Sequence, residues 1–200
     1  MKEAWKNVNG KEWKMAVRIG KAAAKLFNKR GYLETSMNDI AAKAKMSKGG
    51  VYHYFTSKDE ILYFILSNYM DLILADLEQE LSQIESNVSK IKFIISRHIN
   101  LYTKNLSEAK TLLHEANCLP KNKFEIIAGK QRKYFQIVSR VVRESFEKSI
   151  PKDKLTALTF LLFGMCNWIY SWYDPKGSVT PQELSDLIYD IFLKGMSGFQ

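Results

Sequence analysis

The chain has 200 residues, of which 46% are hydrophobic, and this share is large enough to bury the core of an ordinary globular domain. Disorder over the whole length is therefore excluded. The two cysteines, Cys118 and Cys166, show no CxxC or Cys/His ligand spacing, so neither a disulfide framework nor a structural zinc site is expected.

The formal charge of +9 is concentrated in the first third of the chain. Residues 1–58 carry 13 Lys and Arg against 4 Asp and Glu, whereas residues 59–200 carry 17 groups of each sign. A basic module joined to a neutral remainder is typical of a polyanion-binding head on a separate body. Charge alone leaves three alternatives open, namely nucleic acid, a membrane surface and an incidental lysine-rich surface.

Glycine and proline are scarce, at 10 and 4 residues, and long stretches carry no turn signal, so we expect an all-α chain of about nine helices. Residues 1–10 contain no apolar run of signal-peptide length. Together with the cysteine pattern, this favours a cytoplasmic protein.

Start and stop signals divide the first third into three helices followed by a longer fourth. The first is expected at about 11–30, where apolar residues recur at three- and four-residue steps before Gly31. Each of the next three follows a serine that can cap a helix, at Ser36, Ser47 and Ser57. The second and third helices are only about two turns long.

Apolar periodicity then predicts helices near 88–103, 107–117, 123–149 and 151–173, and a last helix begins at Thr180 and Pro181. The stretch 155–173 has no charged residue and could by length span a bilayer. It contains several polar residues and is the only such run in the chain, so we interpret it as a helix that packs on its own domain on one side and on a second copy on the other. No membrane association is expected.

Residues 37–55 have the dimensions of a helix-turn-helix, and the positive charge is concentrated around them. The second of these helices opens with Gly49 and Gly50 in its first turn. Glycines at that place leave backbone N–H groups uncovered where the helix dipole is positive, so that a DNA backbone could approach closely. A purely structural helix has little reason for them, since each costs about 1 kcal/mol relative to alanine.

The region from Met15 to Ile65 resembles the DNA-binding domain of the TetR family of repressors, with matching segments at 31–32, 35–41, 47–49, 52–55 and 57–62. The resemblance implies a DNA-binding domain at 1–56 and a ligand-binding and dimerisation domain of bundled helices at 57–200. It also implies that five residues face the major groove or its rim, namely Lys48, Gly49, Gly50, Tyr52 and His53, and that three hold phosphates, namely Ser36, Tyr54 and Lys58.

The position of Lys58 also indicates a phosphate contact, because a cation at the start of a helix is disfavoured by the helix dipole unless an anion lies in front of it.

Two residues depart from the family pattern. Lys45 stands in the turn where the family usually has glycine, which predicts either a strained left-handed residue or a different turn. Gly50 stands where a serine or threonine is common, so that one hydroxyl contact is missing.

The neutral remainder holds 18 of the 25 aromatic residues, and three polar residues interrupt its apolar faces: His98, Lys130 and Asn167. Buried polar groups need partners. The partner could be the head group of a ligand or an internal hydrogen bond.

The segment 167–177, with 193–195 further on, resembles a subgroup of the family that senses acyl-CoA thioesters and includes regulators of fatty-acid degradation. That resemblance implies an acyl chain among aromatic residues and CoA phosphates held by cations. The candidate effector residues are His98, Lys130, Arg132, Lys133, Tyr134, Asn167, Trp168 and Trp172. Of the outward cations nearby, Lys133, Arg140 and Arg143 could also be simply solvated.

The sequence thus predicts a homodimeric repressor of double-stranded operator DNA, paired through its last two helices and released by a small hydrophobic effector such as a fatty acyl-CoA. The alternative within the family is a regulator of efflux or another pathway with a non-CoA hydrophobic ligand. No resident cofactor or metal is expected. An enzyme is disfavoured because HExxH, GxSxG, GxxxxGK[ST] and a GxGxxG after a strand are all missing from the sequence. A membrane-associated or scaffolding helical protein is the remaining alternative.

Overall fold

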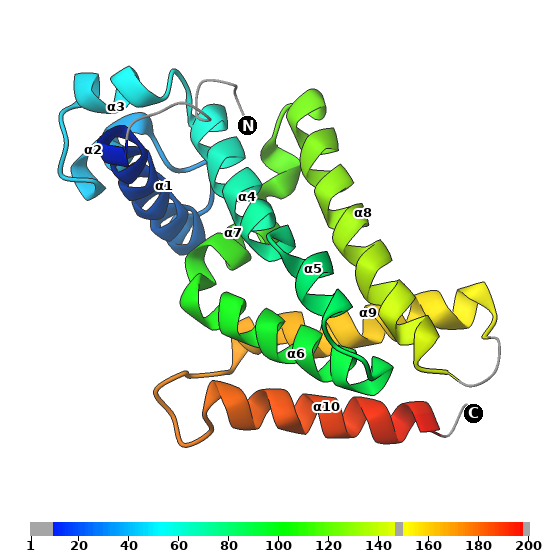
Figure 1. Ribbon diagram of the computed structural model, residues 1–200. Coiled ribbons are helices and arrows are strands. Elements are labelled where there is room, and N and C mark those ends of the chain that lie inside the picture. The colour runs from blue at the N-terminus through cyan, green and yellow to red at the C-terminus, as the bar shows by residue number, and fades with distance from the viewer. Residues whose placement is uncertain (1–9, 147–149, 198–200) are drawn as a thin grey trace. The chain divides into compact units, whose positions relative to one another are not determined.

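The computed structural model describes residues 10–146 and 150–197, and its regular structure there is entirely helical (Figure 1). The helices are α1 (Gly10–Arg30), α2 (Met37–Lys43), α3 (Lys48–Tyr54), α4 (Lys58–Leu74), α5 (Leu77–Ser82), α6 (Asn87–Lys104), α7 (Leu106–Glu115), α8 (Lys121–Glu144), α9 (Lys152–Asn167) and α10 (Pro181–Ser197), with two 3₁₀ turns at Ala116–Cys118 and Trp168–Ser171. The predicted all-α class is confirmed. The short α5 was not predicted as a separate helix.

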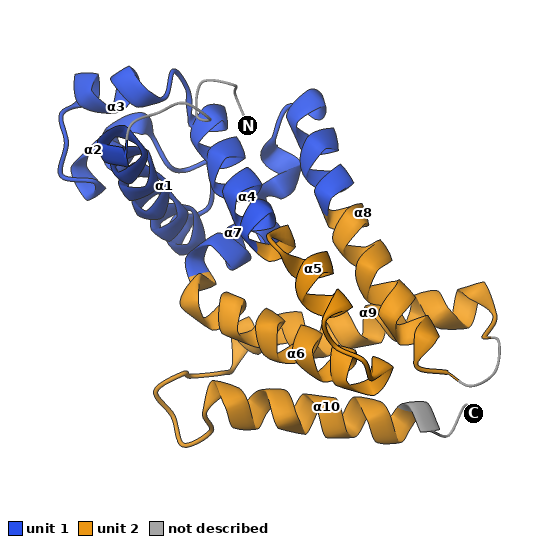
Figure 2. Ribbon diagram, in the orientation of Figure 1, with its two compact units in different colours: residues 1–72, 107–130 blue, residues 73–106, 131–200 orange. Residues whose placement is uncertain are grey.

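Within the described ranges, no helix has both the length and the apolar content needed to cross a membrane. The chain divides into two compact units (Figure 2). One comprises residues 1–72 and 107–130, and the other comprises residues 73–106 and 131–200.

The first unit contains the predicted head of three helices, in which α1 packs on α2 and α2 on α3. The buried side chains that join them are apolar and come from all three helices: Ile19, Ala23, Phe27, Ile40, Ala41 and Val51. α1 ends where predicted, because Gly31 adopts a φ of +88° and donates its N–H to the Phe27 carbonyl at 2.8 Å.

Both short helices of the head begin at the predicted serines. At the start of α2, the Asp39 N–H donates to Ser36 Oγ at 3.2 Å and the Ser36 N–H donates to Asp39 Oδ2 at 2.9 Å, which is a complete capping box. At the start of α3, the Gly50 N–H donates to Ser47 Oγ at 3.0 Å.

The turn between α2 and α3 contains the predicted backbone strain. Lys45 has a φ of +54°, in the left-handed region that glycine adopts without a steric penalty. The next N–H, that of Met46, reaches back to the Ala41 carbonyl at 3.0 Å, so that the chain reverses direction directly after α2. The left-handed alternative at Lys45 is therefore confirmed.

In the second unit α6 and α10 lie side by side, and α9 packs on both (Figure 1). Isoleucines of α6 and large apolar residues of α9 and α10 form the core: Ile91, Ile95, Ile99, Leu158, Leu162, Leu184, Ile188 and Phe192. At the surface of this pair, Lys92 Nζ lies 3.0 Å from Asp186 Oδ1 and 5.5 Å from the ring centroid of Tyr189.

The helix predicted at 151–173 is shorter in the structure. α9 ends at Asn167, and the chain tightens into the 3₁₀ turn Trp168–Ser171 before the loop that contains Pro175. Pro175 keeps only Asp174 out of the helical region, so it does not account for the earlier end of α9. The last helix begins as predicted, because the Thr180 N–H donates to Glu183 Oε2 at 2.7 Å in a second capping box.

Candidate nucleic-acid interface and buried polar cluster

α3 exposes one face and buries the other. Val51 and Phe55 are buried against the head, whereas Lys48, Gly49 and His53 are exposed and Tyr52 is 42% exposed. Four of the five predicted groove-facing residues therefore lie on the surface of the head. The ammonium group of Lys48 lies 6.0 Å from the Tyr52 ring centroid, so these two side chains share one patch.

The two glycines of α3 differ in what a side chain would meet. A Cβ at Gly49 would have no neighbouring atom within 4 Å, whereas a Cβ at Gly50 would lie 3.1 Å from Ser47 Oγ and 3.5 Å from Met46 Cε. Gly50 thus leaves room for the serine that caps α3. Among the described residues, no atom lies close enough to Gly49 to require a glycine there.

Two of the residues predicted to hold phosphates are engaged within the protein. Ser36 takes part in the capping box of α2, and Arg30 bonds the same Asp39 carboxylate, which holds the pKa of Asp39 well below its usual range. Ser36 nonetheless stays exposed. Tyr54 is half-buried, and its ring centroid lies 5.1 Å from that of His53 in an edge-to-face arrangement.

Lys58 has internal partners that the sequence did not reveal. Its ammonium group donates to the carbonyls of Tyr32 at 2.7 Å and Leu33 at 3.2 Å, and it lies 4.2 Å from the Tyr32 ring centroid. A cation at the start of a helix is disfavoured by the helix dipole unless other groups stabilise it. These carbonyls and the ring provide that stabilisation, so a phosphate contact of Lys58 stays a prediction without its electrostatic support.

In the second unit, three predicted effector residues come together in one hydrogen-bonded cluster. His98 Nε2 lies 3.0 Å from Asn167 Oδ1, and His98 Nδ1 lies 3.1 Å from the Tyr134 hydroxyl. The rings of Tyr102 and Phe163 lie 6.2 and 6.1 Å from the imidazole. For His98 and Asn167 the structure therefore bears out the internal hydrogen bond, one of the two alternatives for a buried polar group.

Burial lowers the pKa of His98 to about 4, although the hydrogen bond from its ring to Asn167 acts in the opposite direction. The imidazole is consequently neutral near pH 7 and carries a single N–H. That N–H is on Nε2, because it faces the carbonyl oxygen of Asn167, and the other ring nitrogen accepts from the Tyr134 hydroxyl.

Tyr102, beside this cluster, is a buried side chain with an orphaned polar atom. It is only 2% exposed, and its hydroxyl has no hydrogen-bond partner within residues 10–146 and 150–197. Burial raises the pKa of this hydroxyl well above its usual range, so it remains a donor at all physiological pH values. A buried donor without an acceptor costs about 1–3 kcal/mol, and any acceptor brought next to it would recover part of that cost.

Two of the three cations predicted to meet CoA phosphates contact carboxylates. In the first unit, Lys130 Nζ lies 2.6 Å from Asp71 Oδ1 and 2.8 Å from Ser67 Oγ. In the second unit, Lys133 Nζ lies 3.6 Å from Glu78 Oε2, and Arg132 is exposed. The interruption of the apolar face by Lys130 is thus explained by its contacts with Asp71 and Ser67.

The two predicted tryptophans are at the surface of the second unit. Trp168 is 63% exposed and Trp172 is 60% exposed, so neither lines a closed cavity in this structure. Trp168 continues an exposed apolar face of α9 that includes Phe160 and Leu161, and α10 presents Leu187 and Ile191 in the same way. Large exposed apolar side chains gathered on neighbouring helices are typical of interaction surfaces.

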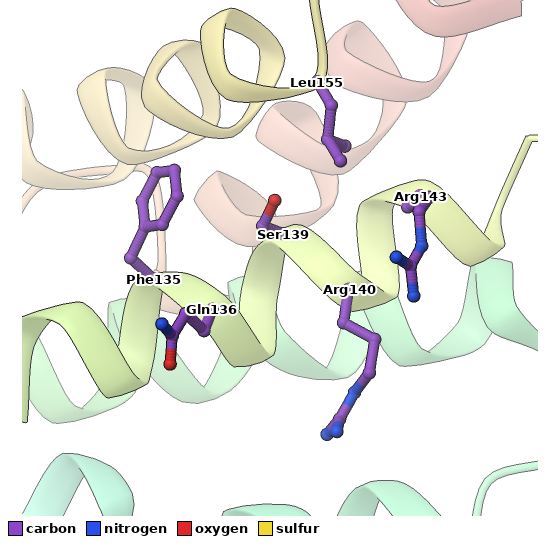
Figure 3. A pocket seen from close by; sticks show the side chains of 6 residues that line it. All are labelled: Phe135, Gln136, Ser139, Arg140, Arg143 and Leu155. Carbon is purple, nitrogen blue, oxygen red and sulfur yellow. The ribbon is translucent and has the colours of Figure 1, made fainter. Parts of the chain in front are cut away.

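A small open pocket of about 170 Å³ lies between α8 and the start of α9 (Figure 3). Its lining residues are Phe135, Gln136, Ser139, Arg140, Arg143 and Leu155. Figure 3 shows Phe135 and Ser139 directed toward α9 and Arg140 directed away from it, where its guanidinium meets Glu78 at 3.2 Å. Sites for drug-sized ligands enclose about 300–1,000 Å³, so this pocket is too small for an acyl-CoA.

Two family models match the chain. The model of bacterial regulatory proteins of the tetR family matches residues 19–63, and the model of the tetracyclin repressor-like C-terminal domain matches residues 85–196. The chain belongs to the TetR family. It is therefore a DNA-binding transcriptional regulator, and the first match covers α2, the turn and α3, whose geometry is described above.

Individual relatives of this TetR-family chain cover most of its length. It is 22% identical to the HTH-type transcriptional repressor KstR2 of Mycobacterium tuberculosis over 178 residues, 88% of this chain and 89% of that protein. It is 25% identical to the fatty acid metabolism regulator protein of Bacillus subtilis over 138 residues, 67% of this chain and 69% of that protein. The solved structure of AibR in complex with isovaleryl coenzyme A and operator DNA superposes with a TM-score of 0.77 at 28% identity, covering 88% of this chain and 97% of that one.

The neutral state of His98 generates a prediction on stability against pH. An unfolded histidine takes up a proton near pH 6.5, whereas folded His98 does so only near pH 4, so the unfolded state binds more protons between these values. We expect the free energy of unfolding to fall by up to about 3 kcal/mol from pH 7 to pH 4 through this group. Urea unfolding at several pH values measures it. The variant His98→Gln should show a shallower dependence in this window, and an equal slope in both proteins would contradict the assignment.

Proposed function

We propose that this TetR-family regulator is a repressor that reads its operator with the exposed face of α3 and leaves it when a hydrophobic effector binds the helical body. The observation that supports the first part is the exposure of Lys48, Gly49, Tyr52 and His53 on one face of a capped two-turn helix. Tyr52 and His53 offer a hydroxyl and an imidazole to base edges, Lys48 offers a charge to phosphates, and Gly49 allows close approach.

The reading role of α3 predicts two different mutant effects. The operator is first selected from random duplexes by repeated binding and is expected to be a near-palindrome with half-sites roughly 34–36 Å apart. His53→Ala should relax the base preference at one position of each half-site. Lys48→Ala should weaken binding to all sequences and lower the salt slope by about one unit per protomer. Lys176→Ala, an exposed lysine of the loop before α10, is the control. An unchanged preference in His53→Ala would remove this residue from the readers.

We propose further that the repressor is a homodimer formed by α9 and α10. The support comes from exposed apolar side chains on α9, on the turn that follows it and on α10, namely Phe160, Leu161, Trp168, Leu187 and Ile191. Both helices thus have one apolar face in the core of the unit and a second one in solvent. A second copy presents the same apolar surface and can bury both.

The dimer assignment predicts that Ile191→Glu yields a folded monomer. Ile191 is 62% exposed, so the substitution should change the free energy of unfolding of a single chain by no more than about 0.5 kcal/mol. Light scattering at micromolar concentration should report a dimer for the natural chain and a monomer for the variant. Gln79→Glu adds the same charge on α5 and serves as the control. A dimeric Ile191→Glu would place the interface elsewhere.

For the effector we propose a fatty acyl-CoA, recognised by the cluster around His98. The orphaned hydroxyl of Tyr102 can donate to a carbonyl oxygen, and the adjacent rings of His98, Tyr134 and Phe163 provide apolar surface for an acyl chain. A thioester combines both features. Two similar proteins, a fatty acid metabolism regulator and one whose structure contains isovaleryl coenzyme A, support the same class.

One observation favours a second candidate, a hydrophobic carbonyl compound without CoA. Lys130 and Lys133, which were predicted to hold the phosphates, contact Asp71 and Glu78 instead. These pairs would have to open for phosphates to bind there. A ligand without phosphates would leave them intact.

The effector proposal predicts a selective loss in Tyr102→Phe. The experiment measures two effects of each compound, a rise in the thermal unfolding midpoint and the release of a labelled operator duplex. The compounds are isovaleryl-CoA, longer acyl-CoA esters, free CoA, and the matching free acids and methyl esters. Acyl-CoA esters should do both, and free CoA should do neither. Tyr102→Phe should be at least as stable as the natural chain, because it removes an unpaired buried hydroxyl, yet bind the effector about 3- to 10-fold more weakly.

Tyr189→Phe, a half-buried tyrosine of α10, is the matched control and should respond like the natural chain. Response to the methyl esters but not to the CoA esters would favour the second candidate. Response to neither class would contradict both.

A further inference from the structure

The exposed face of α1 carries an uninterrupted row of cations. Six side chains repeat at three- and four-residue steps, and all of them are exposed: Lys11, Lys14, Arg18, Lys21, Lys25 and Lys29. At 100° per residue they fall within about 80° of arc on the helix, and from first to last they extend over about 27 Å. We call this row the α1 stripe.

The α1 stripe lies opposite the face with which α1 packs. The buried residues of α1 are Ala16, Ile19, Gly20, Ala22, Ala23, Ala24 and Phe27, and most of them lie on the other side of the helix. The single acidic residue of α1, Glu12, lies outside the arc of the stripe. The core of the head therefore does not require cations here.

The pattern is unfavourable for the helix by itself. Neighbours at i,i+3 and i,i+4 along the stripe carry the same charge, and such pairs destabilise a helix, whereas alternating signs would stabilise it. A face selected only for solubility has no reason to exclude acids. The stripe therefore has the composition expected of a surface that meets a polyanion.

Among polyanions, duplex DNA fits the position and the dimensions of the stripe. B-form DNA carries a phosphate charge about every 1.7 Å along its axis, so a row of about 27 Å faces many phosphates. α1 belongs to the same compact unit as α3. Once α3 holds an operator, the adjoining base pairs of the same molecule are present at a high effective concentration, whereas a separate duplex has to be recruited from solution.

We propose that the α1 stripe binds the phosphate backbone of the DNA that flanks the operator, without regard to sequence. This inference rests on the operator binding proposed above. Its consequence is that flanking DNA adds affinity that the recognition contacts of α3 do not supply, and that this added affinity depends steeply on salt.

The test compares two duplexes, one that contains only the two half-sites and one that adds about 20 base pairs of arbitrary sequence on each side. The variant Lys14→Gln/Lys21→Gln/Lys25→Gln removes three charges and spares Arg18, whose guanidinium contacts the Lys45 carbonyl. The control Lys121→Gln/Lys152→Gln/Lys176→Gln removes three exposed lysines outside α1. Thermal unfolding of all three proteins shows that they are folded, and the stripe variant should be no less stable than the natural chain.

The natural chain and the control should bind the long duplex at least 10-fold more tightly than the short one at low salt, with a steeper salt slope. The stripe variant should bind the short duplex like the natural chain, lose the gain on the long duplex, and show a salt slope lower by about 2–3 units per protomer in contact.

Equal affinity of the natural chain for both duplexes would overturn the proposal. The proposal would also be overturned if the stripe variant lost the same affinity for the short duplex as for the long one. A third contrary result would be that the operator complex captures a separate duplex while flank length has no effect on affinity. If the natural chain fails to bind the short duplex, the operator proposal itself falls. If only the length effect is missing, the operator proposal stands and the stripe proposal falls.

Discussion

Helices of seven residues are not stable by themselves in water, because the cost of nucleation exceeds what two turns of backbone hydrogen bonds return. Both α2 and α3 have this length, and everything proposed for the head depends on their being held in place. Two devices hold them. Each helix has a serine cap that accepts the N–H of its third residue, and Ile40, Ala41 and Val51 bury the inner faces against the core of the head. The outer face of α3 is therefore not needed for packing, and it carries the exposed residues Lys48, Tyr52 and His53.

The second unit buries several polar side chains among the apolar residues of its helices. His98, Tyr134 and Asn167 satisfy one another, and the neutral imidazole avoids the cost of a buried charge. Tyr102 is the member of this region whose hydroxyl is not satisfied within the described residues. A binding site for a carbonyl compound needs a donor of this kind, kept away from water and not engaged elsewhere.

Two surfaces of the chain are difficult to explain for a protein that acts alone, and they differ in chemistry. The exposed faces of α9 and α10 carry large apolar side chains, which would be more stable when covered. The exposed face of α1 is cationic, and its neighbouring charges repel one another. An apolar partner of the same shape suits the first surface, and a polyanion suits the second. A dimeric regulator bound to DNA supplies both.

Local features of the sequence were sufficient to predict most of the helices and their ends. The caps at Ser36, Ser47 and Thr180, the left-handed Lys45 and the end of α1 at Gly31 all depend on residues no more than about five apart. The tertiary structure alone decided the partners of the polar side chains. Lys58 bonds a carbonyl 26 residues away, Lys130 an aspartate 59 residues away and His98 an amide 69 residues away. Periodicity and capping describe one helix at a time, whereas these contacts form only when separate helices pack together. The sequence therefore indicated that these polar side chains need partners, but it could not identify the partners.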